Sequence, residues 1–476
     1  MSVSIPEERI RLLNSQPTRA GGHYVLYAMQ AAQRVDDNPA LALAVARANE
    51  LGQPLVVAFC LMWDFPEASL RHFTFMLDGL VETFEQLRGI GALPVLVEGE
   101  WAREMHRLSE QASEMVLDQG YLRLHKAAYA ELAKTVDCRL FQVEGEAVVP
   151  VKVASEKVEY AARTLRPRIH RHLADFLHRV KVAKVQTPPA GLSLPSLDGE
   201  LENVDKFLSG REIDDKVGPV RQFFLGGPSQ GQEQLNGFLE SRLARYDDMR
   251  NQPQTDYTSC MSPYLHYGMI SPVHLALSVL EQAGNRDPQA ESYVEELVVR
   301  RGLSQNFCQF TEGYDSWNCL PDWARLTLGQ HKDDQRPHCY TRQQLEGAQT
   351  HDPYWNAAQV EMVETGYMHN YMRMYWGKKI LEWSSSPEYA YETTLYLNNR
   401  YFLDGRDPVS FANIAWIFGL HDRAWQERPI YGKIRCMMAS GLERKSDPQA
   451  YVAKIERRTG RKVHAQTSRG DTLQLF

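Results

Sequence analysis

Short apolar segments that alternate with helical patterns constrain the fold of residues 20–150 more than any other feature of the sequence. The apolar runs lie at residues 23–29, 54–60, 94–97, 115–117 and 139–143. Stretches with helical spacing, such as 39–52 and 68–89, lie between them. This alternation is typical of βαβ units and a parallel sheet. No G-x-G-x-x-G follows any of these runs, so a dinucleotide site is not indicated.

The pattern becomes helical and basic at residues 151–184, and Gly and Pro then punctuate residues 186–231. After residue 232, apolar residues recur at i, i+3 and i+4 in six segments, at 234–249, 273–283, 291–310, 355–366, 371–383 and 387–398. We therefore predict an α/β fold with a Rossmann-like parallel sheet domain at 20–150. A connector at 151–231 and a large all-helical domain at 232–476 follow it.

Composition limits the kind of protein. Hydrophobic residues make up 43% of the 476 residues and charged residues 24%, which is the usual globular balance. No run reaches the roughly 18 apolar residues that a membrane-spanning helix needs, and the start of the chain lacks the apolar core of a signal peptide. The seven cysteines include no C-x-x-C pair, which indicates reduced thiols and no structural metal site. We expect a cytoplasmic protein, or a nuclear one in a eukaryote.

Charge is distributed unevenly along the chain. The net charge is −7, yet residues 421–476 hold twelve Lys or Arg and six Asp or Glu. A basic C-terminal region of this kind either meets a phosphate backbone or is a solvated surface, and charge alone leaves both readings open.

The segment Gly227-Pro-Ser-Gln-Gly231 matches the G-x-S-x-G motif of a nucleophile elbow. A nucleophile elbow needs a buried strand directly before the serine. Here Pro228 precedes Ser229 and the segment lies in the predicted connector, so a glycine-rich loop explains it better than a hydrolase does.

Tryptophans gather in the helical region, where seven of the nine lie between residues 317 and 425. Trp376 and Trp383 are seven residues apart in one helical segment, which puts them on the same face about 10 Å apart along the axis. Aromatic rings at such steps can pass an electron by hopping, although ordinary core packing gives the same pattern.

Two further features concern charged groups. The segment Thr258-Ser-Cys-Met-Ser-Pro263 sets hydroxyl groups before a Ser-Pro helix start, which suits an anion and equally suits a simple helix cap. Arg373 lies in an apolar, aromatic helix where its charge needs a partner. We expect that partner to be Glu392, in a pair that is either purely structural or tunes the electrostatics beside a redox cofactor.

Together these features resemble the photolyase/cryptochrome family, and specifically the class II cyclobutane pyrimidine dimer (CPD) photolyases. Glu295-Glu-Leu-Val-Val-Arg-Arg301 and Leu403-Asp-Gly-Arg-Asp-Pro408 carry part of the resemblance. Other segments that carry it lie at 27–38, 160–168, 302–308, 350–359, 396–399 and 421–425. They occur in the family's order over nearly the whole chain.

The resemblance implies non-covalently bound FAD. Arg373 and Glu392 would form an ion pair beside the flavin ring, and Asn398 would face its N5 atom. Arg300 would also reach the cofactor. The phosphates would lie against Tyr246, Thr258, Ser259, Cys260, Met261 and Ser262.

The resemblance also implies an electron relay and a substrate site. Trp376, Trp355 and Trp383 would carry electrons between flavin and surface, with Tyr340 assisting. The substrate would be DNA containing CPDs, split by an electron from excited reduced FAD. Its dimer would contact Arg250, Glu296, Met374 and Trp416. The other CPD classes have Trp three residues after that Glu, whereas this chain has Val299.

Alternatives within the family stay open. A cryptochrome would use the same FAD and relay for signalling without repair, although the short C-terminal segment, Asn398, Glu296 and Met374 favour repair. A (6-4) photolyase needs two His residues four positions apart. Here the residue four positions after His369 is Arg373, not a histidine. The sheet domain is expected to hold an antenna chromophore, an 8-hydroxydeazaflavin or else a folate. We expect a monomer without membrane contact.

Overall fold

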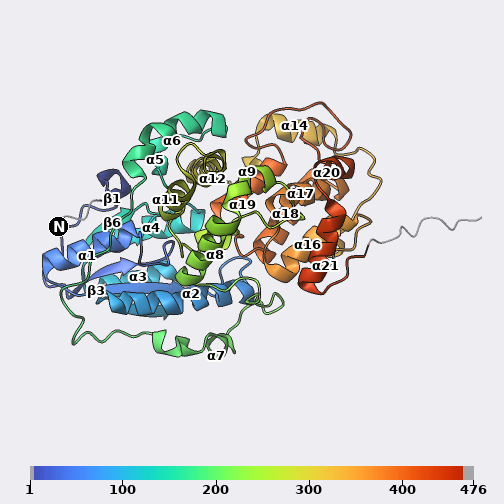
Figure 1. The fold of residues 1–476 in the computed structure, drawn as a ribbon. Helices are drawn as coiled ribbons and strands as arrows, with labels where there is room; N and C mark the ends of the chain where they lie inside the picture. Colours follow the sequence, from blue (N-terminus) through green and yellow to red (C-terminus); the bar gives the residue numbers. More distant parts are fainter. Residues whose placement is uncertain (1–4, 465–476) are drawn as a thin grey trace, which may run out of the picture. The chain divides into compact units, whose positions relative to one another are not determined.

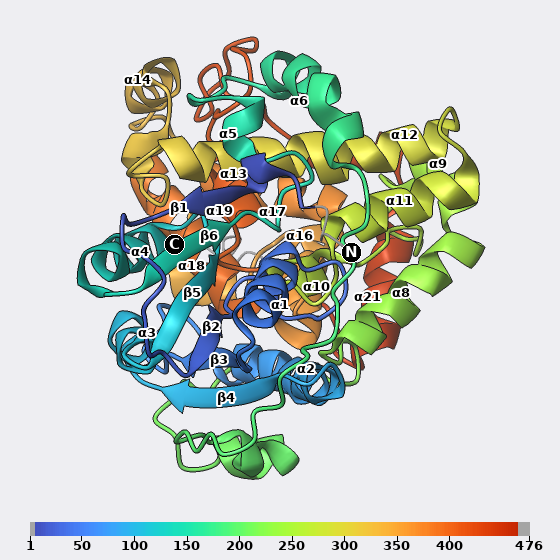
Figure 2. The same ribbon diagram turned by 90° about the vertical axis from the view of Figure 1, so that its left-hand side faces the viewer.

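Six strands form one sheet in the order β1-β6-β5-β2-β3-β4 within residues 5–464, which the computed structural model describes. Every neighbouring pair is parallel except β1 and β6, which are antiparallel. Figure 2 shows the strands side by side. Their bounds are β1 Ile10–Leu12, β2 Tyr24–Ala28, β3 Leu55–Leu61, β4 Leu93–Glu98, β5 Ala112–Asp118 and β6 Arg139–Val143. The five predicted strands are confirmed. The sequence prediction missed β1, because three residues show no periodicity.

Helices cover both faces of the sheet, as a parallel sheet requires. Alternate side chains of β2, such as Val25 and Tyr27, pack with α1 (Pro39–Leu51) and α2 (Leu70–Gly89). Leu26 and Ala28 point to the other face, with α3 (Trp101–Ser109) and α4 (Arg123–Thr135). All five residues of β2 and all seven of β3 are buried, which explains why both read as continuous apolar runs.

The chain divides into two compact units. Unit 1 contains the sheet and extends as far as Leu243, and it also contains Ser259–Glu312. Unit 2 contains Ala244–Thr258 and the chain from Gly313 onward. The predicted helical region therefore contributes to both units, and the division at residues 258 and 259 falls inside the Thr258–Ser262 segment.

Helices account for most of the chain after the sheet (Figure 1). In unit 1 they are α5 Val151–Ala154, α6 Ala162–Phe176, α7 Val204–Leu208, α8 Pro228–Ser241, α10 Ser262–His266, α11 Pro272–Ala283, α12 Pro288–Val294 and α13 Arg301–Phe310. A π-helical turn, Glu295–Arg300, joins α12 to α13. In unit 2 they are α9 Tyr246–Met249, α14 Asp322–Gln330, α15 Arg342–Glu346, α16 Pro353–Thr365, α17 Asn370–Trp383, α18 Pro387–Tyr401, α19 Pro408–Ile417, α20 Ala439–Lys445 and α21 Pro448–Thr459.

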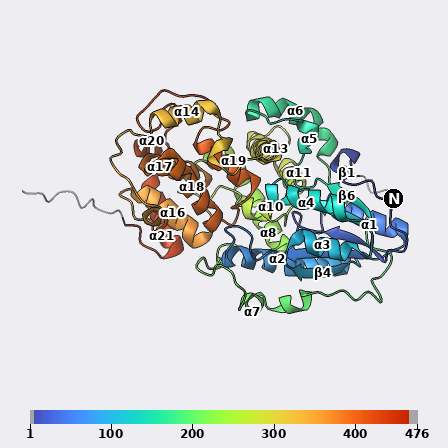
Figure 3. The ribbon, with the colours of Figure 1, turned by 180° about the vertical axis from the view of Figure 1, so that it is seen from behind.

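The core of unit 2 is built around α16 and α17. Helix α16 packs against α17 and α21, and α17 packs against α18 and α19, as Figure 3 shows. The carboxylate of Asp352 accepts hydrogen bonds from the N–H groups of Tyr354 and Trp355 at the start of α16. Ser386 caps α18 in the same way, and proline follows each of the two caps. These caps fix where the helices that carry Trp355 and Asn398 begin.

Among the described residues, no helix is both long and apolar enough to cross a bilayer. All seven cysteines lie in the described range and are free thiols.

Candidate functional site

The guanidinium of Arg373 in α17 is held on several sides. It makes two hydrogen bonds of 3.0 Å to the carboxylate of Asp404, and its Nε donates to the carbonyl of Met368 at 3.0 Å. The ring of Phe402 lies 3.9 Å from the guanidinium carbon and that of Tyr367 lies 5.4 Å from it. A planar cation with a bidentate carboxylate and an aromatic face is strongly fixed in orientation.

The prediction that Glu392 is the partner of Arg373 is wrong. Glu392 lies in α18 six residues before Asn398, which is about one and two-thirds turns, so the two residues occupy different faces of the helix. Asn398 is buried and Glu392 is exposed. The carboxylate that neutralises Arg373 comes from Asp404, on the loop after α18.

Asn398 lies near the end of α18 and is 4% exposed. Its Nδ2 donates to Oδ1 of Asn399 at 3.0 Å. The loop that carries Asp404 returns close to this helix, and a Cβ on Gly405 would meet the Asn398 carbonyl oxygen at 2.9 Å. Glycine is therefore required at 405, because a side chain there would push the loop off α18. The close approach of the loop to α18 at Gly405 therefore keeps Asp404 near Asn398.

The hydroxyl segment is shaped by its backbone. Cys260 has a φ of +57°, a left-handed conformation that is costly for a residue with a side chain. In unit 1, the carbonyl of Ser259 accepts a hydrogen bond of 2.7 Å from Gln234. In unit 2, the hydroxyl of Tyr367 donates to Thr258 at 3.5 Å. Helix α10 has only five residues, so the helix-dipole contribution that the Ser-Pro pattern predicted is small.

In unit 2 each predicted relay residue contacts the next, through a hydrogen bond to the Trp376 backbone at one step and through ring contacts at the other two. The indole N–H of Trp355 donates to the carbonyl of Trp376 at 2.9 Å. The Trp355 and Trp383 ring centres are 5.9 Å apart, and those of Trp383 and Tyr340 are 5.7 Å apart. The three tryptophans are buried and Tyr340 is half-buried, so the contacts lead from the core toward solvent. The indole of Trp376 is held by Gln359 at 2.8 Å.

Trp416, a predicted substrate residue, lies half-buried at the end of α19 and near two basic side chains. Nζ of Lys378 is 5.0 Å from one of its ring centres, and the guanidinium of Arg435 is 5.6 Å away. Arg435 also lies 4.2 Å from the ring of Trp425 and pairs with Asp422. Lys378 is fully buried, and burial lowers the pKa of its ammonium to about 7. Met374, four residues before Lys378 on α17, is half-buried.

Glu296 lies in the π-helical turn of unit 1 and is half-buried. Its neighbour Glu295 holds two arginines, with Arg166 at 2.7 Å and Arg300 at 3.1 Å. The side chain of Arg300 is 54% exposed. Turns of this type insert one extra residue into a helix and occur often at functional sites.

Two more predicted residues lie together in unit 2. Tyr246 begins α9 and is buried, and the guanidinium of Arg250 is 5.7 Å from its ring centre. Arg250 lies 3.9 Å from the carboxylate of Asp247.

The basic C-terminal region is only partly available to a partner. Arg435, Lys454, Arg461 and Lys462 pair with acidic side chains. Arg457, on α21, is exposed. Residues 465–476, which include Arg469, lie outside the described residues.

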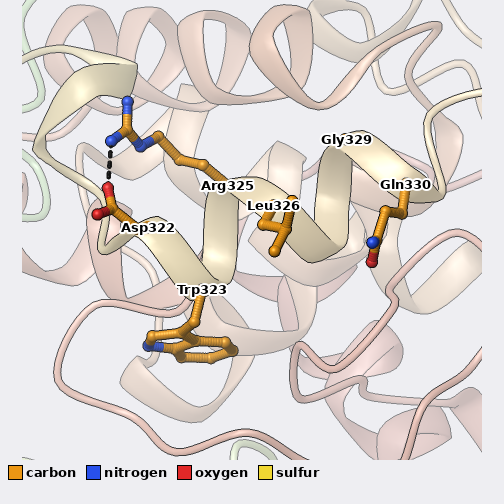
Figure 4. A pocket seen from close by; sticks show the side chains of 6 residues that line it. All are labelled: Asp322, Trp323, Arg325, Leu326, Gly329 and Gln330. Carbon is orange, nitrogen blue, oxygen red and sulfur yellow. Dashed lines mark hydrogen bonds and ion pairs between the residues drawn. The ribbon is translucent and has the colours of Figure 1, made fainter.

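Other candidates do not form catalytic sites. The N–H and hydroxyl groups of Ser229 both donate to Glu82, and Ser229 opens α8 without a preceding strand, so it is no nucleophile elbow. A shallow hollow of about 620 Å³ lies along α14, where Trp323 and Leu326 project from one helix (Figure 4). None of the predicted site residues lines it.

Three residues of this region were not assigned roles from the sequence: Asp404, Gln359 and His351. Asp404 lies in the Leu403–Pro408 motif, where an acidic residue beside a required glycine was the available signal. Gln359 and His351 lie in the 350–359 segment that carries the resemblance, but their roles depend on contacts with Trp376 and Tyr340, which are on other segments.

Comparison with solved structures defines the fold class. A cryptochrome from Synechocystis superposes with a TM-score of 0.71 at 16% identity, over 93% of this chain and 91% of that one. A class III photolyase from Agrobacterium tumefaciens gives 0.68 at 18% identity, over 93% and 88%. An archaeal photolyase from Sulfolobus tokodaii with two FAD molecules gives 0.68 at 15% identity, over 91% and 89%. The fold is therefore that of photolyases and cryptochromes.

Sequence comparison identifies the family. The model described as DNA photolyase matches residues 25–189. The deoxyribodipyrimidine photo-lyase of Methanothermobacter thermautotrophicus is 44% identical over 95% of this chain and 98% of that protein. The one from Arabidopsis thaliana is 37% identical over 96% and 94%. The chain belongs to the DNA photolyase family.

Proposed function

We propose that this protein is a class II photolyase that uses light and non-covalently bound FAD to split cyclobutane pyrimidine dimers in DNA. The observation that carries the proposal is the unbroken contact chain from Trp376 through Trp355 and Trp383 to Tyr340. It occurs in a family member whose relatives at up to 44% identity are named deoxyribodipyrimidine photo-lyases.

The side chains assigned to the cofactor site have polar groups that fit FAD. Arg373, fixed by Asp404, offers a cation to the flavin ring, and Asn398 offers a buried amide to it. Hydroxyl groups of Thr258, Ser259 and Ser262 suit a diphosphate, with Tyr246 and Arg300 as further contacts. His369, one turn before Arg373, is buried, and its Nε2 has no hydrogen-bond partner within residues 5–464. A buried polar atom without a partner favours a missing ligand nearby.

Reduced FAD, when excited by light, supplies the electron that opens a cyclobutane ring, and the cofactor rather than the protein carries that chemistry. The protein's part is to bind and orient. Asn398 is buried, and the aromatic rings beside Arg373 would help to keep water from a bound flavin. The tryptophan chain supplies electrons that keep the flavin reduced, and Tyr340 is its end nearest to solvent.

DNA recognition is assigned to a separate set of residues. A crosslinked dimer stacks poorly, so its extrusion from the duplex costs less than that of normal bases. Glu296 is proposed to accept a hydrogen bond from the flipped pyrimidine edge. Met374 and Trp416 would pack against the dimer and Arg250 would steady it. Trp416, near Lys378 and Arg435, is the candidate for the stacking surface that Val299 cannot provide.

The experiment that tests the function has two readouts. The first is the absorbance of the supernatant after denaturation, where released FAD is expected at close to one per chain. The second is light-dependent repair of oligonucleotides that carry either a CPD or a (6-4) lesion. Repair of the CPD alone is expected. Flavin without any repair would instead indicate a cryptochrome, and a colourless protein that takes up no FAD would overturn the proposal.

An antenna chromophore remains part of the proposal. The sheet unit is assigned an 8-hydroxydeazaflavin, or else a folate, and the Sulfolobus tokodaii photolyase holds two FAD molecules. The spectrum of the purified protein distinguishes these three. The protein is proposed to act as an intracellular monomer, which light scattering and localisation in the source cell test.

A further inference from the structure

The phenol of Tyr340 and the imidazole of His351 form a closed hydrogen-bonded pair at the outer end of the tryptophan chain. The Tyr340 oxygen is 2.8 Å from Nδ1 of His351. The same oxygen accepts a hydrogen bond of 3.1 Å from the backbone N–H of His351. Because that N–H already donates to the phenol oxygen, the arrangement that satisfies all three groups has the phenol donate to Nδ1.

The pair is attached to Trp383 on two sides. The backbone N–H of Tyr340 donates to the Trp383 carbonyl at 2.9 Å. The ring centre of His351 is 5.0 Å from that of Trp383, and Tyr340's is 5.7 Å away. An electron that leaves Tyr340 can therefore pass directly to the ring of Trp383, with which it is in aromatic contact.

The surroundings of His351 favour a neutral ring. Burial lowers the pKa of His351 below 6.5, and the neighbouring His338 lowers it further, with a smaller opposing effect from Asp352. Lys379 lowers it as well and Glu382 raises it. The ring of His338 stacks on that of His351 with centres 3.6 Å apart. A neutral imidazole with its proton on Nε2 leaves Nδ1 free to accept a proton.

We propose that His351 is the proton acceptor that allows Tyr340 to serve as the final electron donor of the relay. The proposal rests on the proposed function, which supplies the oxidant as the radical cation of Trp383. In the step, one electron moves from Tyr340 to Trp383, which returns to a neutral indole. The phenol O–H bond breaks and an N–H bond forms at Nδ1 of His351. A neutral tyrosyl radical and an imidazolium remain.

This coupling explains why the pair lies at the end of the chain. An oxidised phenol is a strong acid, so oxidation of tyrosine is favourable only when its proton can leave. Once the proton is on His351, return of the electron needs return of the proton as well, which delays the back reaction. The backbone N–H of His351 stays bonded to the radical oxygen throughout.

The first test follows the radicals in the FAD-loaded full chain after a light flash. In the wild type, the tryptophan radical should decay as a neutral tyrosyl radical appears in transient absorption and electron paramagnetic resonance. His351→Asn keeps an acceptor oxygen but offers no base, and should slow this transfer on the order of 100-fold. Tyr340→Phe should abolish the tyrosyl signal. His338→Asn, which leaves the Tyr340 hydrogen bond in place, is the matched control. An unchanged rate in His351→Asn would overturn the proposal.

The second test needs no light. Nitrogen NMR of the purified chain labelled at histidine should show Nδ1 of His351 without a proton at pH 7.5 and perturbed in Tyr340→Phe. A proton on Nδ1 at that pH would overturn the proposal. If no tryptophan radical forms in the loaded protein, the proposed relay fails, and this NMR result still decides separately whether Tyr340 donates to His351.

Discussion

The guanidinium of Arg373 and the carboxylate of Asp404 are joined by two parallel hydrogen bonds of 3.0 Å, across 31 positions of the chain. The pair connects α17 to the loop that ends α18, and both side chains are mostly buried. Removal of one partner from such a pair leaves a buried charge uncompensated, which costs far more than the pair itself contributes.

Asp404→Asn should therefore destabilise the protein by roughly 3 kcal/mol and lower its FAD content. Urea unfolding and released-flavin absorbance measure the two effects. Glu392→Gln is the matched control, because Glu392 is exposed on α18, and it should leave both quantities unchanged. Equal losses in the two variants would contradict the assignment of Asp404.

Trp376→Phe should slow photoreduction of the flavin at least tenfold, because it removes the innermost ring of the contact chain. Repair by enzyme that has been reduced chemically should stay close to wild type, since that reaction does not draw on the relay. The absorbance of oxidised flavin under illumination measures the first effect. Trp323→Phe, which alters a tryptophan of α14 outside the contact chain, is the control.

Glu296→Ala should lower repair per bound flavin by about one to two powers of ten, because a donor on the dimer is then left without a partner. FAD content should change little. Glu295→Gln is an informative neighbour, since it breaks the pairs with Arg166 and Arg300. It should cost up to about 1 kcal/mol of stability, as partly exposed ion pairs do, with repair per flavin unchanged. The opposite pattern in the two variants would remove Glu296 from the substrate site.

Lys378 gives a pH dependence of stability. Burial lowers its pKa from 10.5 to about 7, so between these values the unfolded chain holds a proton that the folded protein has released. This group therefore makes the free energy of unfolding rise with pH above 7, by up to about 1.4 kcal/mol per pH unit.

Lys378→Met should remove that slope, so the variant gains most in relative stability at pH 6 to 7 and least at pH 9. Urea unfolding at four pH values measures the difference between variant and wild type. Lys379→Met, which alters a lysine paired with Glu382, provides the comparison. A constant difference across the pH range would show that Lys378 keeps its proton.

Periodicity in the sequence was enough to predict five of the six strands described for the sheet, and the long helices. Leu55–Leu61 is apolar throughout because both of its faces are covered, and α16, α17 and α18 lie within a few residues of their predicted positions. The partner of Arg373 could not be predicted in the same way. The choice between Glu392 and Asp404 depends on which face of α18 is buried and on how closely a loop returns at Gly405. Those are properties of packing, which a pattern of residue types does not contain.

The division of the chain into units has a consequence for synthesis. The chain leaves unit 1 after Leu243, returns to it at Ser259 and leaves it again after Glu312. A ribosome makes the chain from its N-terminus, and domains tend to fold as they emerge. Ala244–Thr258 is therefore translated before every other part of its own unit, and must wait for Gly313 and the residues beyond it. No single cut in the gene separates the two units, so any uninterrupted fragment that contains the whole of one unit also carries part of the other.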